Sequence, residues 1–320
     1  MEILLLKNIS DVMSYALYIL IAILVLLAMI TVHEFGHYIA GKIFGFGINE
    51  FSIGFGPKLF SKKKKNGEVF SLRLIPLGGF CAFSGEDEES LDPKDFNNKK
   101  PWQRIIVLIS GALMNFLLAI IIICSMFLTY GHTALMTYKV KSDSGFTSEN
   151  SFCDKDVILS VNGKSIYLIT DLMTSIKGKK EGEEVFCKVI RNGVKQDVAV
   201  KIRSDVGVEN VEDMKNVCDA LGVAYTANSD GVITELGFRS TGVRLNFFET
   251  IGKSFEYSFK LVGTIFVVIG QLITGSLGIG SLGGTVTTIS VTASAIKAGG
   301  LWSLLNIAGF IGVNLAVFNL

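Results

Sequence analysis

Three long apolar runs dominate the pattern of hydrophobic and polar positions along the chain. Residues 14–32, 105–130 and 301–320 contain no charged side chain, and each is long enough to cross a bilayer core as a helix, which takes about 20 residues. These runs predict a polytopic α-helical membrane protein. A fourth apolar stretch is more ambiguous, because residues 261–273 either span or lie against the other helices, while the glycine-rich residues 275–284 belong inside protein or in a loop.

Between the first two runs the pattern changes to that of β-strands. Residues 48–57 are aromatic and punctuated by glycine, and residues 69–76 alternate between apolar and polar side chains. Four lysines at 62–65 and then Asn66-Gly67 lie between these stretches, and Asn-Gly is a strong signal for a hairpin turn. Because its flanks are apolar, we expect a membrane-associated β-hairpin here.

Residues 131–250 alternate between short strand-like segments and turns. Residues 156–166 predict a strand, a tight turn and a strand, residues 171–177 a short helix, and residues 184–202 a second hairpin. A helix near 211–221 and strands near Val223 and Val232 are expected to follow. The pattern predicts a small α+β domain inserted between membrane segments, so the chain divides at 1–130, 131–250 and 251–320.

The composition agrees with a membrane protein that also has a soluble part. Hydrophobic residues make up 49% of the 320 residues, charged residues only 18%, and the mean hydropathy is +0.48, whereas soluble proteins average about 25% charged residues. The net charge of +1 gives no sign of a nucleic-acid partner. The five cysteines lack CxxC spacing and predict no disulfide framework. The N-terminal run has no cleavage signal, so we expect it to stay in the mature protein.

Lysine and arginine side chains set the expected orientation in the membrane. The loop between the first two spans carries the lysines at 62–65 together with Arg73, Lys99, Lys100 and Arg104. By the positive-inside rule this loop, residues 40–103, is cytoplasmic. The inserted domain is then extracytoplasmic, and the first span ends near the cytoplasmic face.

The first span runs directly into an HExxH motif, His33-Glu34-Phe35-Gly36-His37. Histidines four residues apart share one helix face and converge on one Zn²⁺ ion, and the neighbouring Glu can act as general base toward water. A bare HExxH also occurs by chance, but ionisable side chains at membrane depth are costly, which favours a functional site. We therefore expect His33 and His37 to bind zinc and Glu34 to be catalytic.

The motif supplies only part of a catalytic zinc site, which takes three protein ligands and an open position. His132 lies at the outer end of the second span, on the wrong side of the expected membrane, and no Asp lies in any apolar run. Asn115, inside the second span, is either a helix–helix hydrogen bonder or a residue near the site. The chain stops within its last apolar run at Leu320, which we interpret as a truncated sequence.

Eight short motifs are spread over nearly the whole chain: HEFGH at 33–37, GFG at 45–47, GFGP at 54–57, PLGGF at 76–80, SGALMNF at 110–116, VNG at 161–163, RNG at 191–193 and NLAVFNL at 314–320. In these motifs and in their order, the chain resembles the bacterial site-2 proteases, intramembrane zinc metalloproteases of the regulator-of-sigma-E protease type. One departure is Lys155, where that family usually has glycine in a turn of the inserted domain.

The resemblance implies regulated intramembrane proteolysis in the bacterial plasma (inner) membrane. Its substrates would be single-pass membrane proteins, such as anti-sigma factors and signal-peptide remnants. The inserted domain would be PDZ-like, contacting peptides and excluding bulky ectodomains. The resemblance also implies that residues 261–273 are membrane-associated rather than spanning.

The resemblance further implies a third zinc ligand, an Asp just beyond Leu320, without which we expect this chain to be inactive. Asn319 would hold the substrate backbone, and the hairpin would pair with an unwound substrate strand. The substrate-binding residues implied in this way are Asn319, Val69, Phe70, Ser71, Leu72, Arg73 and Leu74.

Two rival functions belong to other classes. A non-catalytic membrane scaffold would bind partners through a PDZ-like domain and carry a degenerate metal site, but the intact HExxH argues against it. A metal transporter would need further polar residues within the spans, beyond side chains such as Asn115 and Asn314.

Overall fold

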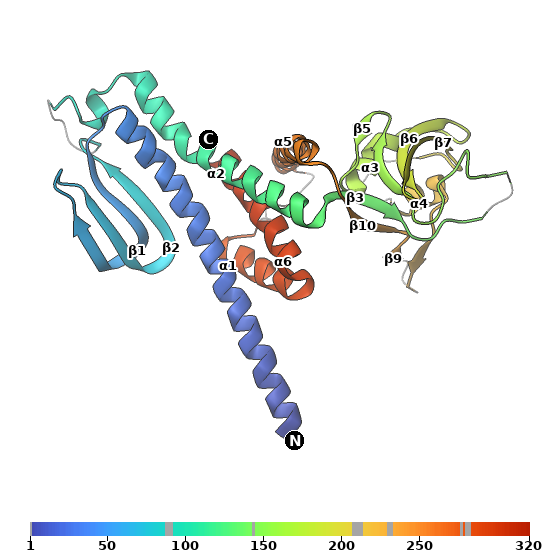
Figure 1. The fold of residues 1–320 in the computed structure, drawn as a ribbon, viewed down its shortest axis with the longest axis horizontal. Helices are drawn as coiled ribbons and strands as arrows, with labels where there is room; N and C mark the ends of the chain where they lie inside the picture. The colour runs from blue at the N-terminus through green and yellow to red at the C-terminus, as the bar shows by residue number, and fades with distance from the viewer. Residues whose placement is uncertain are drawn as a thin grey trace. The chain divides into compact units, whose positions relative to one another are not determined.

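The computed structural model describes residues 2–86, 92–142, 145–206, 214–228, 233–275, 278 and 283–320. The chain divides into two compact units. Unit 1 comprises Met1–Met126 and Ile251–Leu320, and unit 2 comprises Phe127–Thr250 (Figure 1). Each unit is described by itself below.

Four helices in the described ranges are long and apolar enough to cross a membrane: α1 (Glu2–Ile43), α2 (Pro101–Tyr130), α5 (Phe247–Ile273) and α6 (Thr285–Phe318). The helices α1 and α2 confirm the first two predicted runs. Gly300 has φ 58° and ψ −139°, so α6 consists of two helices that meet at a sharp bend (Figure 1). The second of them covers residues 301–318 of the third predicted run, which was expected at 301–320.

The helix α5 begins at Phe247, well before the apolar stretch that the sequence indicated at 261–273. Its first turns carry charged side chains, including Glu249, Lys253 and Lys260, and this polar face hid the helix from a search for uncharged runs. Most of the glycine-rich stretch that follows at 275–284, predicted to lie inside protein or in a loop, is outside the described residues.

Small residues let the helices of unit 1 pack closely. A Cβ on Gly36 of α1 would lie 2.4 Å from the carbonyl oxygen of Ser110 in α2, and a Cβ on Gly312 of α6 would lie 2.9 Å from the Cβ of Ala119. Side chains would force these helices apart, so the glycines set the distances between helix axes. α1 and α6 also share an apolar cluster around Met29 and Ile311.

The strands β1 (Ile48–Lys63) and β2 (Val69–Phe83) form the predicted hairpin. The glycines in these strands with positive φ are Gly54 (84°), Gly56 (79°) and Gly78 (154°). They allow each strand to fold back, so the pair makes four short segments. Residues 69–72 pair with 60–63 on one side and with 50–53 on the other, and 50–53 pair in turn with 79–82.

The order across this sheet is therefore 58–63, 69–73, 48–53 and 79–83. The segment at 69–73 is interior, and the segment at 79–83 forms one edge. A short 3-10 helix, η1 (Phe96–Asn98), precedes α2, and its Phe96 packs in the cluster that joins the sheet to α1.

Glu50 ties three of these segments together. Its carboxylate accepts hydrogen bonds from Ser71 Oγ at 2.5 Å, Arg73 Nη2 at 2.8 Å and Lys58 Nζ at 2.9 Å. Burial by itself raises the pKa of this carboxyl, but the three hydrogen bonds outweigh it and lower the pKa to about 2. The hairpin is thus a fixed structural element rather than a loose arm.

Unit 2 is built around an antiparallel sheet of order β10-β3-β4-β6-β7, with the short β5 paired to β4. Both predicted hairpins are present, and their turns at Asn162-Gly163 and Asn192-Gly193 all have positive φ, as Asn-Gly turns require. The strands of this sheet are β3 (His132–Thr137), β4 (Val157–Val161), β5 (Lys164–Ser165), β6 (Glu184–Arg191), β7 (Val194–Lys201) and β10 (Phe238–Val243).

Two short helices complete the core of unit 2, α3 (Ile169–Ile176) and α4 (Met214–Leu221), whose buried apolar faces pack with the strands. The predicted helix at 211–221 is seen from Met214 onward, because residues 211–213 lie outside the described part. A separate pair, β8 (Tyr225–Ala227) and β9 (Ile233–Leu236), follows. The predicted strand near Val223 is a single bridge to Val140, and Val232 lies outside the described residues.

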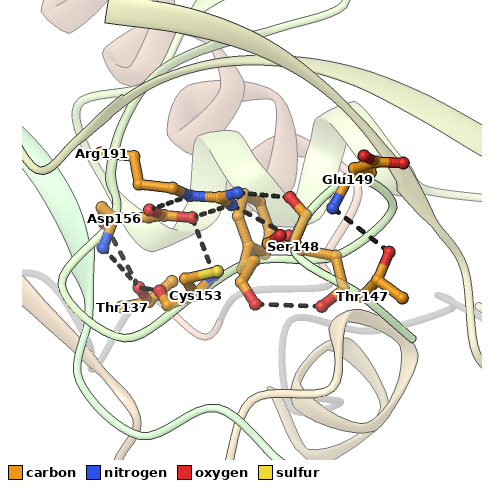
Figure 2. Close-up of polar contacts among 9 residues, drawn as sticks. Thr137, Thr147, Ser148, Glu149, Cys153, Asp156 and Arg191 are labelled. Atoms are coloured by element: carbon orange, nitrogen blue, oxygen red, sulfur yellow. Dashed lines mark hydrogen bonds and ion pairs between the residues drawn. The ribbon is translucent and has the colours of Figure 1, made fainter. Parts of the chain in front are cut away.

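A buried ion pair fixes the loop before β4 (Figure 2). Asp156 is fully buried, and Arg191 donates to its carboxylate from Nε at 2.8 Å and from Nη2 at 2.6 Å. Arg191 also donates to the carbonyl oxygens of Ser148 and Ser151. The preceding residue, Lys155, has φ 66°. That conformation explains why glycine suits this position in the resembling family, since glycine adopts positive φ without strain.

Candidate active site

The HExxH motif lies within α1 and brings its two histidines together. The Nε2 atoms of His33 and His37 are 3.1 Å apart, and the two ring planes meet at 87°. Two nitrogen ligands that each lie 2.0–2.1 Å from a tetrahedral zinc ion are about 3.3 Å apart. The separation and the donor type therefore both fit a zinc ion held by this pair.

The helix α2 holds His37 and leaves room beside both rings. His37 Nδ1 lies 2.7 Å from the carbonyl oxygen of Val107. Because only a protonated ring nitrogen can donate to a carbonyl, Nδ1 carries the proton and Nε2 presents its lone pair. A Cβ on Gly111 would lie 2.4 Å from His37 Nε2 and 2.7 Å from His33 Cε1. A side chain at position 111 would fill the space where the two nitrogens converge.

Asn115 belongs to the same stripe of α2 as Val107 and Gly111, because the three residues are spaced by four. Its side chain is fully buried, and Nδ2 lies 3.4 Å from His33 Nδ1. Of the two roles that the sequence left open for Asn115, this geometry favours the one beside the motif.

Glu34 contacts the sheet rather than this stripe of α2. Its carboxylate is hydrogen-bonded to the backbone of Cys81, and its Cγ lies 3.4 Å from the position of a Cβ on Gly79. Both residues belong to segment 79–83, which has a strand neighbour on one side only within the described residues. The candidate general base therefore lies beside an unpaired strand edge.

A cleft of about 710 Å³ lies next to this edge, between α1, β2 and α6. Ile30, one turn before Glu34, lines it and also lies 3.8 Å from the position of a Cβ on Gly79. Leu77 lines the cleft from β2, and Asn314 and Phe318 line it from α6. Its walls are mainly apolar, with the polar side chains of α6 as the exception.

The structure changes the expected role of the hairpin residues. Residues 69–72, which include Ser71 and Leu72, have strand neighbours on both sides, so they offer no free edge to a substrate strand. Arg73 is engaged with Glu50 and with the carbonyl oxygen of Gly56. The sequence pattern indicated one simple hairpin and gave no sign that each strand folds back at glycine. The free edge beside Glu34 is at 79–83 instead.

Asn319 lies at the end of α6, where it is exposed and donates its backbone N–H to Leu315. Within the described part of the chain it forms no hydrogen bond with the three HExxH side chains. Among those same residues, no group of three or more His, Cys, Asp or Glu side chains gathers to hold a metal ion. The histidine pair is thus the part of a zinc site that the described residues supply.

Comparison with known proteins agrees with this geometry. The profile of peptidase family M50, the site-2 proteases, matches residues 21–320. This chain belongs to peptidase family M50. A protein of Clostridium perfringens named "Putative zinc metalloprotease" is 31% identical over 307 residues, which cover 95% of this chain and 83% of the relative. Zinc metalloprotease RasP of Bacillus licheniformis is 25% identical over 93% of this chain and 85% of its own length.

Membership in M50, the names of these relatives and the four long apolar helices together support a membrane metalloprotease. Two features of this M50 site were not visible in the sequence. The motif SGALMNF indicated close helix contact, but nothing in it showed that Gly111 lies against the histidines. The edge at Gly79 to Cys81 was also missed, because its position depends on the folding back of β1 and β2.

Proposed function

We propose that this M50 chain is an intramembrane zinc endopeptidase that cleaves single-pass membrane proteins, with anti-sigma factors and signal-peptide remnants as the substrate class. The observation that carries the proposal is the 3.1 Å approach of His33 Nε2 and His37 Nε2 on a helix apolar enough to cross a membrane. The lipid bilayer is then the medium of the reaction, and no nucleic acid takes part.

His33 and His37 would hold a Zn²⁺ ion, which would supply Lewis-acid activation of water and of the scissile carbonyl. Glu34 moves the proton. Its carboxylate accepts a proton from the attacking water and returns it to the leaving amide nitrogen. Contact with the backbone of Cys81 keeps the carboxylate beside the place where a substrate strand would lie.

Substrate must be unwound before it can be cut, because a helical amide is shielded by its own hydrogen bonds. An extended peptide paired with the edge at 79–83 replaces those bonds with strand hydrogen bonds. It then passes Glu34, and alternate side chains enter the cleft lined by Ile30, Leu77 and Asn314. Asn319, at the end of α6, remains our proposed contact for the substrate backbone.

The enzyme is placed in the bacterial plasma membrane, with residues 40–103 cytoplasmic because of their lysines and arginines. Unit 2 is proposed to be an extracytoplasmic PDZ-like domain that contacts peptides and excludes substrates with bulky ectodomains. The short strands of its sheet and the two short helices α3 and α4 support this assignment.

The test uses full-length protein and a single-span model substrate in proteoliposomes, with cleavage followed on gels. Glu34→Gln removes the proton acceptor at nearly constant shape, so we expect cleavage to fall by about 10²–10⁴-fold. A zinc chelator should abolish cleavage, and added Zn²⁺ should restore it. The matched control is Glu256→Gln on the exposed face of α5, which should leave the rate unchanged. Unchanged cleavage by Glu34→Gln would disprove the mechanism.

A further inference from the structure

We infer that Asn115 is a positioning residue for His33. Its side-chain oxygen accepts the Nδ1–H of His33 and thereby holds the imidazole in the tautomer whose Nε2 faces the metal position. This inference rests on the proposed zinc site and adds to it a group that HExxH does not contain.

The first support is an unsatisfied atom. Asn115 is fully buried, and its Oδ1 has no hydrogen-bond partner among the residues that the structure describes. A buried amide oxygen left without a partner costs about 1–3 kcal/mol. Such atoms are uncommon in folded proteins, and a specific one calls for an explanation such as a functional role.

The second support is the position of that amide. The other end of the same side chain, Nδ2, lies 3.4 Å from His33 Nδ1. When Nε2 of His33 binds a metal, Nδ1 carries the ring proton, so two donors would face each other across this gap. A half-turn of the nearly symmetric amide brings Oδ1 to the ring and replaces that clash with an Nδ1–H···O hydrogen bond.

The third support is the matching arrangement at the second histidine. His37 Nδ1 meets the carbonyl oxygen of Val107, two helical turns earlier on the same stripe of α2. One stripe of α2 therefore orients both rings, using a backbone carbonyl at 107 and a side chain at 115. Only the second of these can be removed by substitution.

The test measures the zinc affinity of purified full-length protein by competition with a chromogenic chelator. Asn115→Leu keeps the approximate volume but removes the acceptor, so we expect zinc affinity to fall by about 10–100-fold. Asn115→Asp restores an acceptor and should return the affinity to the order of magnitude of the wild type. The absorption spectrum of the Co²⁺-loaded protein should change in the Leu variant and recover in the Asp variant.

The matched control is Ile123→Ala on α2, the helix that carries Asn115. It removes a buried side chain that packs against Gly309 of α6, away from the histidines. It should lower thermal stability and leave zinc affinity unchanged. Equal zinc affinity in Asn115→Leu and the wild type would overturn the inference, as would equal losses in Asn115→Leu and Ile123→Ala. If the His37→Ala variant binds zinc as tightly as the wild type, the proposed metal site itself fails, and the inference fails with it.

Discussion

Two buried polar clusters, one in each unit, differ in how completely their groups are satisfied. In unit 2, both oxygens of Asp156 accept hydrogen bonds from Arg191, and Oδ2 also accepts the N–H of Cys153 at 2.8 Å. The backbone of Asp156 is satisfied too, because its N–H donates to Thr137 Oγ1 and its carbonyl accepts the N–H of Thr137 (Figure 2). Both side-chain oxygens and both backbone polar groups of Asp156 thus have hydrogen-bond partners within unit 2.

The cluster around HExxH in unit 1 is less complete. Among the residues that the structure describes, Oδ1 of Asn115 has no hydrogen-bond partner, and the strand edge beside Glu34 has a neighbour on one side only. Both lie next to the pair formed by Nε2 of His33 and Nε2 of His37. Unmade interactions cost stability and persist where function uses them. A buried charge whose hydrogen bonds are all made, such as that of Asp156, therefore has a structural role. Buried polar groups that lack partners and lie close together indicate the functional site instead.

The largest effect on stability should come from removing the ion pair between Asp156 and Arg191 in unit 2. Asp156→Asn leaves the partly buried guanidinium of Arg191 without its counter-charge, so we expect the free energy of unfolding of unit 2 to fall by about 3 kcal/mol. Hydrogen exchange at the amides of β4 and β6 in the full-length protein measures this loss. Zinc affinity should not change.

The control for this prediction is Asp197→Asn, which removes an exposed ion pair with Lys188 at 4.0 Å on the same sheet. Exposed pairs contribute about 0–1 kcal/mol, so exchange should hardly change. Equal effects of Asp156→Asn and Asp197→Asn would show that the buried pair is not the structural element that we describe.

The sequence predicted the helices and hairpins that have local signals better than the features that depend on tertiary contacts. Apolar runs and Asn-Gly turns are local signals, so α1, α2 and the hairpins of both units could be found from them. The amphipathic first half of α5 was missed, because its charged face breaks the uncharged run. The fold-back of β1 and β2 was missed as well, because the pairing of 50–53 with 69–72 is a tertiary contact.

The candidate site shows the same division. HExxH encodes the approach of His33 to His37, because helical spacing alone brings the rings together. What surrounds the pair comes from other elements, namely Gly111 and Asn115 on α2 and the strand edge at 79–83. Their relation to the histidines depends on how helices and sheet pack, and no spacing within the sequence reports it.

An effect of intermediate size should come from placing a side chain at position 111, in the space beside the two histidine rings. The Cβ introduced by Gly111→Ala would lie 2.4 Å from His37 Nε2, well inside van der Waals contact, while Val107 holds the other side of the same ring. The ring must shift, so we expect zinc affinity to fall by about 100-fold, as for loss of a group that orients a ligand. The chelator competition described for Asn115 measures it.

The control for Gly111→Ala is Gly263→Ala on α5, where an added Cβ would meet nothing within 4 Å. That change should leave zinc affinity unchanged and favour the helix by about 1 kcal/mol, because alanine has the higher helix propensity. A wild-type affinity in Gly111→Ala would mean that the metal lies elsewhere than between the two rings.

The least perturbing prediction separates the open strand edge from the satisfied interior of the same sheet. Phe80 lies on edge segment 79–83, and Phe70 lies on the interior segment at 69–73; both side chains are half-buried and each stacks on another phenylalanine. A photoreactive benzoylphenylalanine is introduced at either position in a Glu34→Gln background, so that bound substrate is not consumed. Because a substrate strand adds where hydrogen-bonding groups are free, crosslinking should be strong from position 80 and weak from position 70. Stronger crosslinking from position 70 would return the substrate to the segment that the sequence first suggested, and would show that a strand paired on both sides opens to receive it.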